Sequence, residues 1–111
     1  MSRVQLALNV EDLDASIAFY SKLFQTAPAK VREDYANFAI VDPPLKLVLF
    51  ANAGEPGTLN HIGVEVDDLD ATEARVVAAG LKPFSHDDYE PGRRFYFLDP
   101  DGIEYEVVSY H

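Results

Sequence analysis

Three polar side chains of the sequence carry the donor atoms of a metal site. Gln5 offers an amide oxygen, His61 an imidazole nitrogen and Glu106 a carboxylate that stands among apolar neighbours. A carboxylate in such surroundings is costly to bury unless it is paired or bound to a metal. The set is a variant of the facial arrangement of two histidines and one carboxylate, which leaves open positions on an octahedral ion such as Fe(II) or Mn(II). Each residue also has a purely structural explanation: Gln5 as a hydrogen-bonding strand residue, His61 as a structural histidine and Glu106 as an exposed residue of an edge strand.

A second group of residues is a candidate for binding a substrate. Arg93, with Arg94 beside it and Tyr96 nearby, would anchor an anionic substrate next to an aromatic ring. His86 and Tyr89 stand in a polar stretch that would gate a pocket or transfer a proton. The alternatives are a solvated loop around His86 and an exposed strand position for one of the arginines.

Apolar alternation predicts strands for the segments that carry the glutamine and the histidine. Residues 4–10 and residues 61–66 each alternate between an apolar face and a face of small or polar residues. Asp12 and Asp68 follow these segments and are expected to cap amphipathic helices. Further strands are predicted at residues 29–31, 35–41, 45–50, 81–84, 93–98 and 103–110.

The second half of the chain repeats the first. At an offset of 56, six residues recur: Val10, Asp12, Leu13, Asp14, Ala15 and Ala18 correspond to Val66, Asp68, Leu69, Asp70, Ala71 and Ala74. At an offset of 57, Phe38 corresponds to Phe95. We therefore predict one domain over residues 1–111 made of two modules, about 1–53 and about 58–111. Gln5 and His61 are equivalent in the repeat, and equivalent positions approach one another near a pseudo-two-fold axis, so we expect them to meet.

Composition and charge exclude several classes of function. The net charge of −10 would repel a phosphate backbone, which argues against nucleic acid. The chain has no cysteine, which excludes disulfides, thiolate metal sites and cysteine nucleophiles within it. No apolar stretch approaches the roughly 20 residues of a membrane span, and the first residues lack a signal-peptide pattern. We therefore expect a soluble, cytoplasmic protein with neither a membrane nor a nucleic-acid partner.

Several stretches of the sequence resemble one family: residues 1–10, 19–24, 35–39, 43–49 and 59–66. They are similar to the vicinal oxygen chelate superfamily of glyoxalases, bleomycin resistance proteins and extradiol dioxygenases, and most of all to its branch of cadmium-induced proteins and carbon–arsenic lyases. The resemblance implies an α+β fold of two βαβββ modules that form an incomplete barrel around a metal or ligand site. By the matching motifs it places metal ligands at Gln5, His61 and Glu106, and it implies a homodimer.

Two departures from the family pattern bear on the implied activity. Glyoxalase I relatives use a fourth ligand, an acid in the last strand of the first module, where this sequence has Val48 or Leu49. A glyoxalase I reaction is therefore disfavoured. The arsenic lyases hold trivalent arsenic with a vicinal cysteine pair, and this chain has no cysteine.

We therefore predict a divalent-metal-dependent lyase or dioxygenase that acts on a small molecule. Fe(II) is the favoured ion, with Mn(II), Ni(II) or Zn(II) as alternatives. The competing hypothesis is a non-catalytic protein that binds a drug or toxicant and so confers resistance. The net charge of −10 would then favour a cationic ligand in an aromatic pocket. Dependence of ligand binding on metal separates the two hypotheses.

Overall fold

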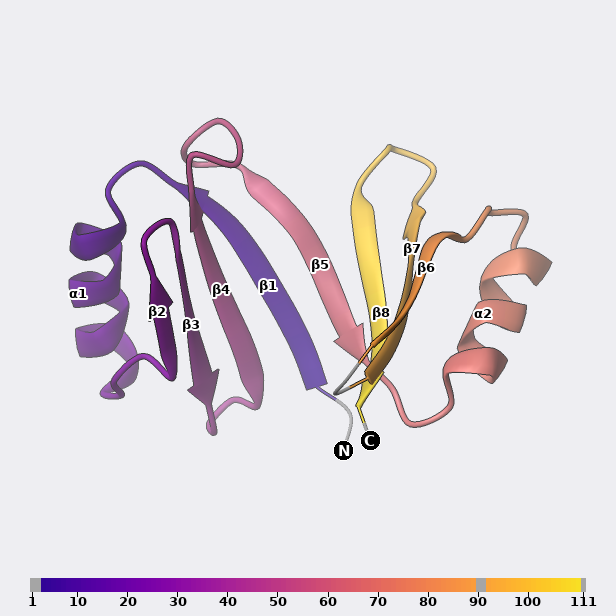
Figure 1. Cartoon of the computed structure of the whole chain (residues 1–111), viewed down its shortest axis with the longest axis horizontal. Helices are drawn as coiled ribbons and strands as arrows, with labels where there is room; N and C mark the ends of the chain where they lie inside the picture. The colour runs from indigo at the N-terminus through magenta and orange to yellow at the C-terminus, as the bar shows by residue number, and fades with distance from the viewer. Residues whose placement is uncertain (1–2, 90–91, 111) are drawn as a thin grey trace. The chain divides into compact units, whose positions relative to one another are not determined.

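The computed structural model describes residues 3–89 and 92–110, and that part of the chain forms two helices and eight strands (Figure 1). In chain order these are β1 (Arg3–Val10), α1 (Leu13–Phe24), β2 (Lys30–Arg32), β3 (Tyr35–Ile40), β4 (Leu45–Ala51), β5 (Leu59–Glu65), α2 (Leu69–Ala78), β6 (Phe84–Tyr89), β7 (Gly92–Leu98) and β8 (Glu104–Tyr110). Each half has the order βαβββ, so the predicted α+β class and the modular order are confirmed.

The strands belong to two compact units, residues 5–60 and residues 61–111 together with residues 1–4. The strand order is β2-β3-β4-β1 in the first unit and β5-β8-β7-β6 in the second. The predicted module boundary near residues 53–58, the single domain and the closure into an incomplete barrel stay predictions.

Helix α1 supplies one side of the core of the first unit, where it packs against β3 and β4. Its predicted apolar stripe is confirmed, because Leu13 is buried and the later stripe residues pack against the same core: Ile17, Tyr20 and Phe24. Asp12 caps the helix by accepting a hydrogen bond from the Ala15 backbone N–H over 3.1 Å. Phe38 of β3, at the centre of this core, is completely buried.

Strand β1 places most of its predicted apolar face on this core. Leu6, Leu8 and Val10 pack against the core, as the alternation predicts. The prediction is wrong for Val4, which is 46% exposed and is grouped with the other unit.

Helix α2 packs against β7 and β8 in the second unit. Its cap is the predicted Asp68, which accepts a hydrogen bond from the Ala71 N–H over 2.9 Å. The buried core residues come from the helix and from β7 and β8: Leu69, Val76, Phe95 and Val107. Partly buried residues of the strands and connections pack against them: Val64, Val66, Leu81 and Phe97. Val77, predicted on the apolar stripe, is 56% exposed. Its neighbour Val76 faces the core, and adjacent residues of a helix point about 100° apart.

Strand β6 begins later than the predicted strand at residues 81–84. The Leu81 N–H donates to the Val76 carbonyl and Gly80 has a φ of 86°, so this stretch closes helix α2. Pro83 has no N–H to donate to a sheet. Pairing therefore starts at Phe84, and the predicted polar loop that contains His86 is a strand.

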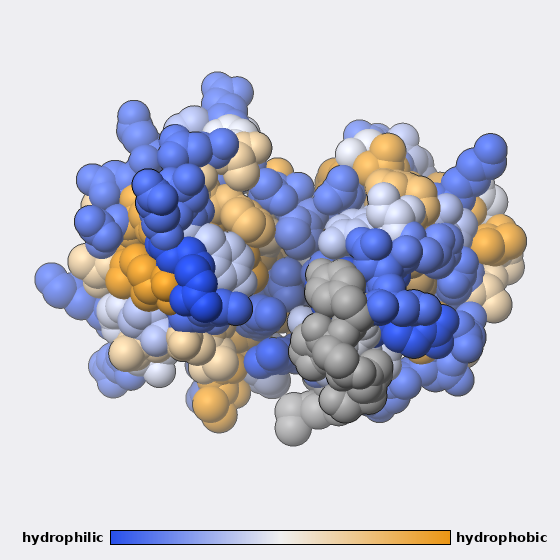
Figure 2. Space-filling model, viewed as in Figure 1, coloured by the Kyte–Doolittle hydropathy of each residue, from blue (hydrophilic) through white to orange (hydrophobic). Residues whose placement is uncertain are grey.

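The surface agrees with the acidic composition. Figure 2 shows mainly hydrophilic residues on the face in view, with small separate apolar areas. Among the described residues, no helix is long and apolar enough to cross a membrane.

Candidate metal centre

The register of three strands collects polar side chains on one face of the second unit. Strand β5 runs parallel to β8, with Gly63 opposite Glu106, and β7 runs antiparallel to β8, with Tyr96 opposite Glu106. Side chains two residues apart share a face of a strand, so His61 joins Gly63 and Arg94 joins Tyr96. The opposite face of these strands packs on helix α2.

Glu106 is the centre of this polar group. Its Oε1 lies 3.9 Å from His61 Nε2. Its Oε2 accepts hydrogen bonds from Arg94 Nη1 over 3.1 Å and from the Tyr96 hydroxyl over 2.9 Å. Both His61 and Glu106 are buried, at 8% and 5% exposure. The carboxylate is therefore held by one oxygen, with the other directed toward the imidazole.

The donor pair is compatible with one shared metal ion. Two ligands that each lie about 2.1 Å from an ion are at most about 4.2 Å apart, which admits the 3.9 Å between His61 Nε2 and Glu106 Oε1. Hydrogen bonds to the second oxygen are typical of ligating carboxylates. Across residues 3–89 and 92–110, no three His, Cys, Asp or Glu side chains form a metal-binding group, so a third ligand from these residues would be of another type. Gln5 is partly buried on β1, and its place as that ligand stays a prediction.

Two of the predicted substrate-binding residues lie on the side of the sheet that faces helix α2. Arg93 pairs with Asp88 at 3.2 Å and with Asp70 of the helix at 3.4 Å, and these hydrogen bonds raise the pKa of Arg93. His86 Nε2 lies 2.8 Å from Glu73 Oε2 of the same helix, and the histidine side chain is 51% exposed. The structure does not bring either residue to the buried carboxylate.

Tyr96 lies at the site through its hydrogen bond to Glu106. Tyr89 ends strand β6, and its side chain is outside the described part of the chain. The arginine at the site is Arg94, whereas the sequence reasoning selected Arg93. Arg94 is two residues from Tyr96, so the two side chains share one face of β7, while Arg93 lies on the other face. Their roles toward a substrate stay predictions.

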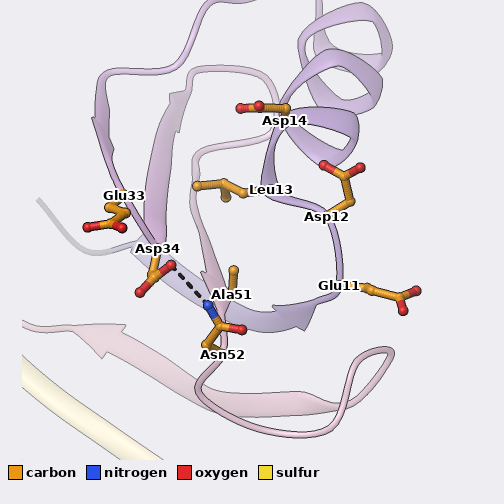
Figure 3. A pocket seen from close by; sticks show the side chains of 8 residues that line it. All are labelled: Glu11, Asp12, Leu13, Asp14, Glu33, Asp34, Ala51 and Asn52. Carbon is orange, nitrogen blue, oxygen red and sulfur yellow. Dashed lines mark hydrogen bonds between the residues drawn. The ribbon is translucent and has the colours of Figure 1, made fainter.

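A separate acidic pocket of about 560 Å³ lies within residues 5–60 (Figure 3). It is lined mainly by carboxylates: Glu11, Asp12, Asp14, Glu33 and Asp34, with Leu13, Ala51 and Asn52. Asp12 caps α1, and Asp34 accepts a hydrogen bond from Asn52 over 3.0 Å, so these two acids have structural roles. None of the predicted site residues lines this pocket.

Tyr110, near the end of β8, gives the second unit a measurable pH dependence. Burial raises the pKa of Tyr110, and the negative charge of Glu106 raises it further. An unfolded tyrosine ionises near pH ~10, so as the pH rises the phenolate forms first in the unfolded chain. We expect the free energy of unfolding to be unaffected by this group below that pH and to fall above it.

Urea unfolding at about pH 8 and about pH 11 measures this effect. Tyr110→Phe should make the fall in stability shallower, whereas Tyr20→Phe on α1 should leave it as in the wild type. An equally steep fall in Tyr110→Phe would contradict the assignment.

Comparison with known proteins gives concordant matches. Residues 3–107 match the family Glyoxalase/Bleomycin resistance protein/Dioxygenase superfamily. Over 84 residues the chain is 63% identical to the cadmium-induced protein CadI of Mycobacterium tuberculosis, covering 73% of this chain and 55% of CadI. The chain thus spans about half the length of CadI.

Two further matches cover nearly all of this chain. A trivalent organoarsenical cleaving enzyme of Thermomonospora curvata is 51% identical over 115 residues, covering 96% of this chain and 76% of that protein. The crystal structure of the Mn(II)-bound glyoxalase from Novosphingobium aromaticivorans has a TM-score of 0.73 at 28% identity, covering 98% of this chain and 40% of that one.

Proposed function

Because the chain belongs to the Glyoxalase/Bleomycin resistance protein/Dioxygenase superfamily, we propose that it is a divalent-metal-dependent enzyme that acts on a small molecule. The observation that supports this most is the buried pair of His61 and Glu106, with donor atoms 3.9 Å apart. Gln5, His61 and Glu106 would hold the ion. A structural relative with bound Mn(II) supports a divalent ion at such a site.

Each residue of the proposed site has a chemical role. A bound divalent ion would supply Lewis acidity toward a substrate oxygen that gains negative charge. His61 and Glu106 would be ligands, and Arg94 and Tyr96 would keep the Glu106 carboxylate from rotating, through hydrogen bonds to Oε2. Three protein ligands leave positions open for the substrate.

The proposed reaction is that of a lyase or a dioxygenase. The relative named as an organoarsenical cleaving enzyme favours bond cleavage. This chain has no cysteine to hold trivalent arsenic as thiolates, so we propose a substrate of a different kind. Fe(II) is the favoured ion because dioxygen chemistry requires a redox-active metal; Mn(II), Ni(II) and Zn(II) are the alternatives.

Metal titration of the chelator-treated protein tests the proposal. We expect one Fe(II) per chain under anaerobic conditions, measured by calorimetry and by metal analysis after gel filtration. His61→Ala should weaken binding by more than about 100-fold, since losing a ligand exceeds the 10–100-fold effect of losing a group that only supports one. The matched control is His86→Ala, the exposed histidine of the same unit, which should bind as the wild type does. Absence of bound metal in the wild type, or full binding by His61→Ala, would contradict the proposal.

The non-catalytic alternative makes a different prediction in the same protein. A resistance protein that only binds would take up a cationic drug without metal and would not change it. Drug binding by the metal-free chain that is unaffected by added Fe(II) would favour that function over ours. The homodimer and the cytoplasmic location stay predictions, and sedimentation equilibrium checks the first of them.

A further inference from the structure

This inference rests on the metal site proposed above and concerns the charges around Glu106, which determine the kind of ligand that the loaded site binds. We propose that Arg94, by neutralising Glu106 inside the protein, makes the loaded site select a small anionic ligand over a neutral one of the same shape. The substrate class is therefore an anion that binds the ion through oxygen. Arg94 is in this sense a specificity-determining residue.

The pairing of Arg94 with Glu106 is buried. Arg94 Nη1 lies 3.1 Å from Glu106 Oε2, and the side chains are only 11% and 7% exposed. The Tyr96 hydroxyl donates to the same oxygen without adding charge. A guanidinium is always protonated in proteins, so the positive charge persists when a metal binds.

The charges of the site can then be added. Glu106 contributes −1 and Arg94 contributes +1, while His61 as a ligand is neutral. Gln5, or a water molecule in its place, is neutral as well. These four groups together sum to zero, and a divalent ion adds +2 to them. Excess charge in a buried site is costly unless it is paired, so an anionic ligand is stabilised there.

A second ion pair of the same unit adds no net charge to these residues. The Arg3 guanidinium and the Glu65 carboxylate form their own pair at 2.7 Å, which is again neutral. The same two ion pairs act on Tyr110. Burial raises its pKa, the carboxylates of Glu106 and Glu65 raise it further, and the guanidiniums of Arg94 and Arg3 lower it. Much of the acidity of the chain lies on exposed surfaces, where salt screens it within about 10 Å.

A pair of probes with one skeleton tests the proposal. Oxalate is a dianion and oxamide is its neutral diamide. We expect oxalate to bind the Co(II)-loaded wild-type protein at least about tenfold more tightly than oxamide does. Oxalate should also bind this loaded form at least about tenfold more tightly than it binds the metal-free protein, which is an ordinary size for coupling between two ligands. Calorimetry gives the affinities, and the visible spectrum of Co(II) shows whether the ion stays on the protein.

Variants of Arg94 and Arg93 test whether the charge of Arg94 causes the preference for oxalate. Arg94→Met leaves the Glu106 charge to offset the ion, so the preference for oxalate over oxamide should shrink by about tenfold and Co(II) alone should bind more tightly. Arg94→Lys keeps the charge and should keep the preference. Arg93→Met is the matched control, since Arg93 pairs with Asp88 and Asp70 and not with Glu106. Arg94→Gln also removes the charge and keeps a hydrogen-bond donor, so it replaces Arg94→Met if that variant does not fold, and the same loss of preference is expected.

Several results would overturn the proposal. Equal affinity for oxalate and oxamide, removal of Co(II) from the protein by oxalate, or an unchanged preference in folded Arg94→Met would each do so while leaving the metal site itself intact. Failure of the wild type to bind Co(II) would instead overturn the metal site and this inference together.

Discussion

Glu106→Gln is expected to abolish stoichiometric metal binding and to lower the free energy of unfolding by about 3–5 kcal/mol, the usual effect of removing one partner of a buried ion pair. The glutamine has nearly the shape of the glutamate but no charge. It therefore removes the negative charge that lies 3.1 Å from the Arg94 guanidinium, which is only 11% exposed. Urea unfolding in the presence of a chelator measures the stability part, and Fe(II) titration measures the binding part.

Glu104→Gln is the matched control, because Glu104 lies on the same strand but is only partly buried. It should change the free energy of unfolding by less than about 1 kcal/mol. The double variant Arg94→Met with Glu106→Gln should be more stable than Glu106→Gln alone, since it removes the buried cation together with the carboxylate charge. A loss in Glu106→Gln no larger than in the control would show that the ion pair does not stabilise the fold.

Phe95→Ala and Phe38→Ala should each lower the free energy of unfolding by about 3–5 kcal/mol, the range for aromatic truncations in a core. Both side chains are completely buried, one in the core of each unit. Strands and a helix surround each ring and are expected to relax only partly into the cavity, so packing contacts and hydrophobic burial are both lost.

Phe19→Ala serves as the control for these core variants, because Phe19 is 58% exposed and should cost less than about 1 kcal/mol. Thermal unfolding gives the overall loss. Hydrogen exchange shows which unit loses stability. Phe95→Ala should reduce protection mainly in residues 61–110, and Phe38→Ala mainly in residues 5–60. A core variant that costs no more than Phe19→Ala would contradict the packing described above.

Local signals in the sequence predict much of this fold. Asp12 and Asp68 begin the helices where predicted, because a capping side chain needs only the backbone three residues further on. Phe38 and Phe95 correspond in the repeat and are buried in equivalent cores. The start of strand β6 is predicted wrongly. The apolar residues from Leu81 onward suggest a strand, but Leu81 hydrogen-bonds to helix α2 and Pro83 has no N–H to pair with a neighbouring strand.

For the candidate site, the sequence predicts some of the residues and the tertiary structure decides the others. Residue types and the repeat select His61 and Glu106 as candidate ligands; the structure buries both side chains, and their role as metal ligands stays a prediction. Choosing between Arg93 and Arg94 was beyond the sequence, because alternation says that they face opposite sides of a strand but not which side is the polar one. The pairing of β7 with β8 and the packing of α2 decide it: they place Arg94 on the buried carboxylate and Arg93 beside Asp70 of the helix.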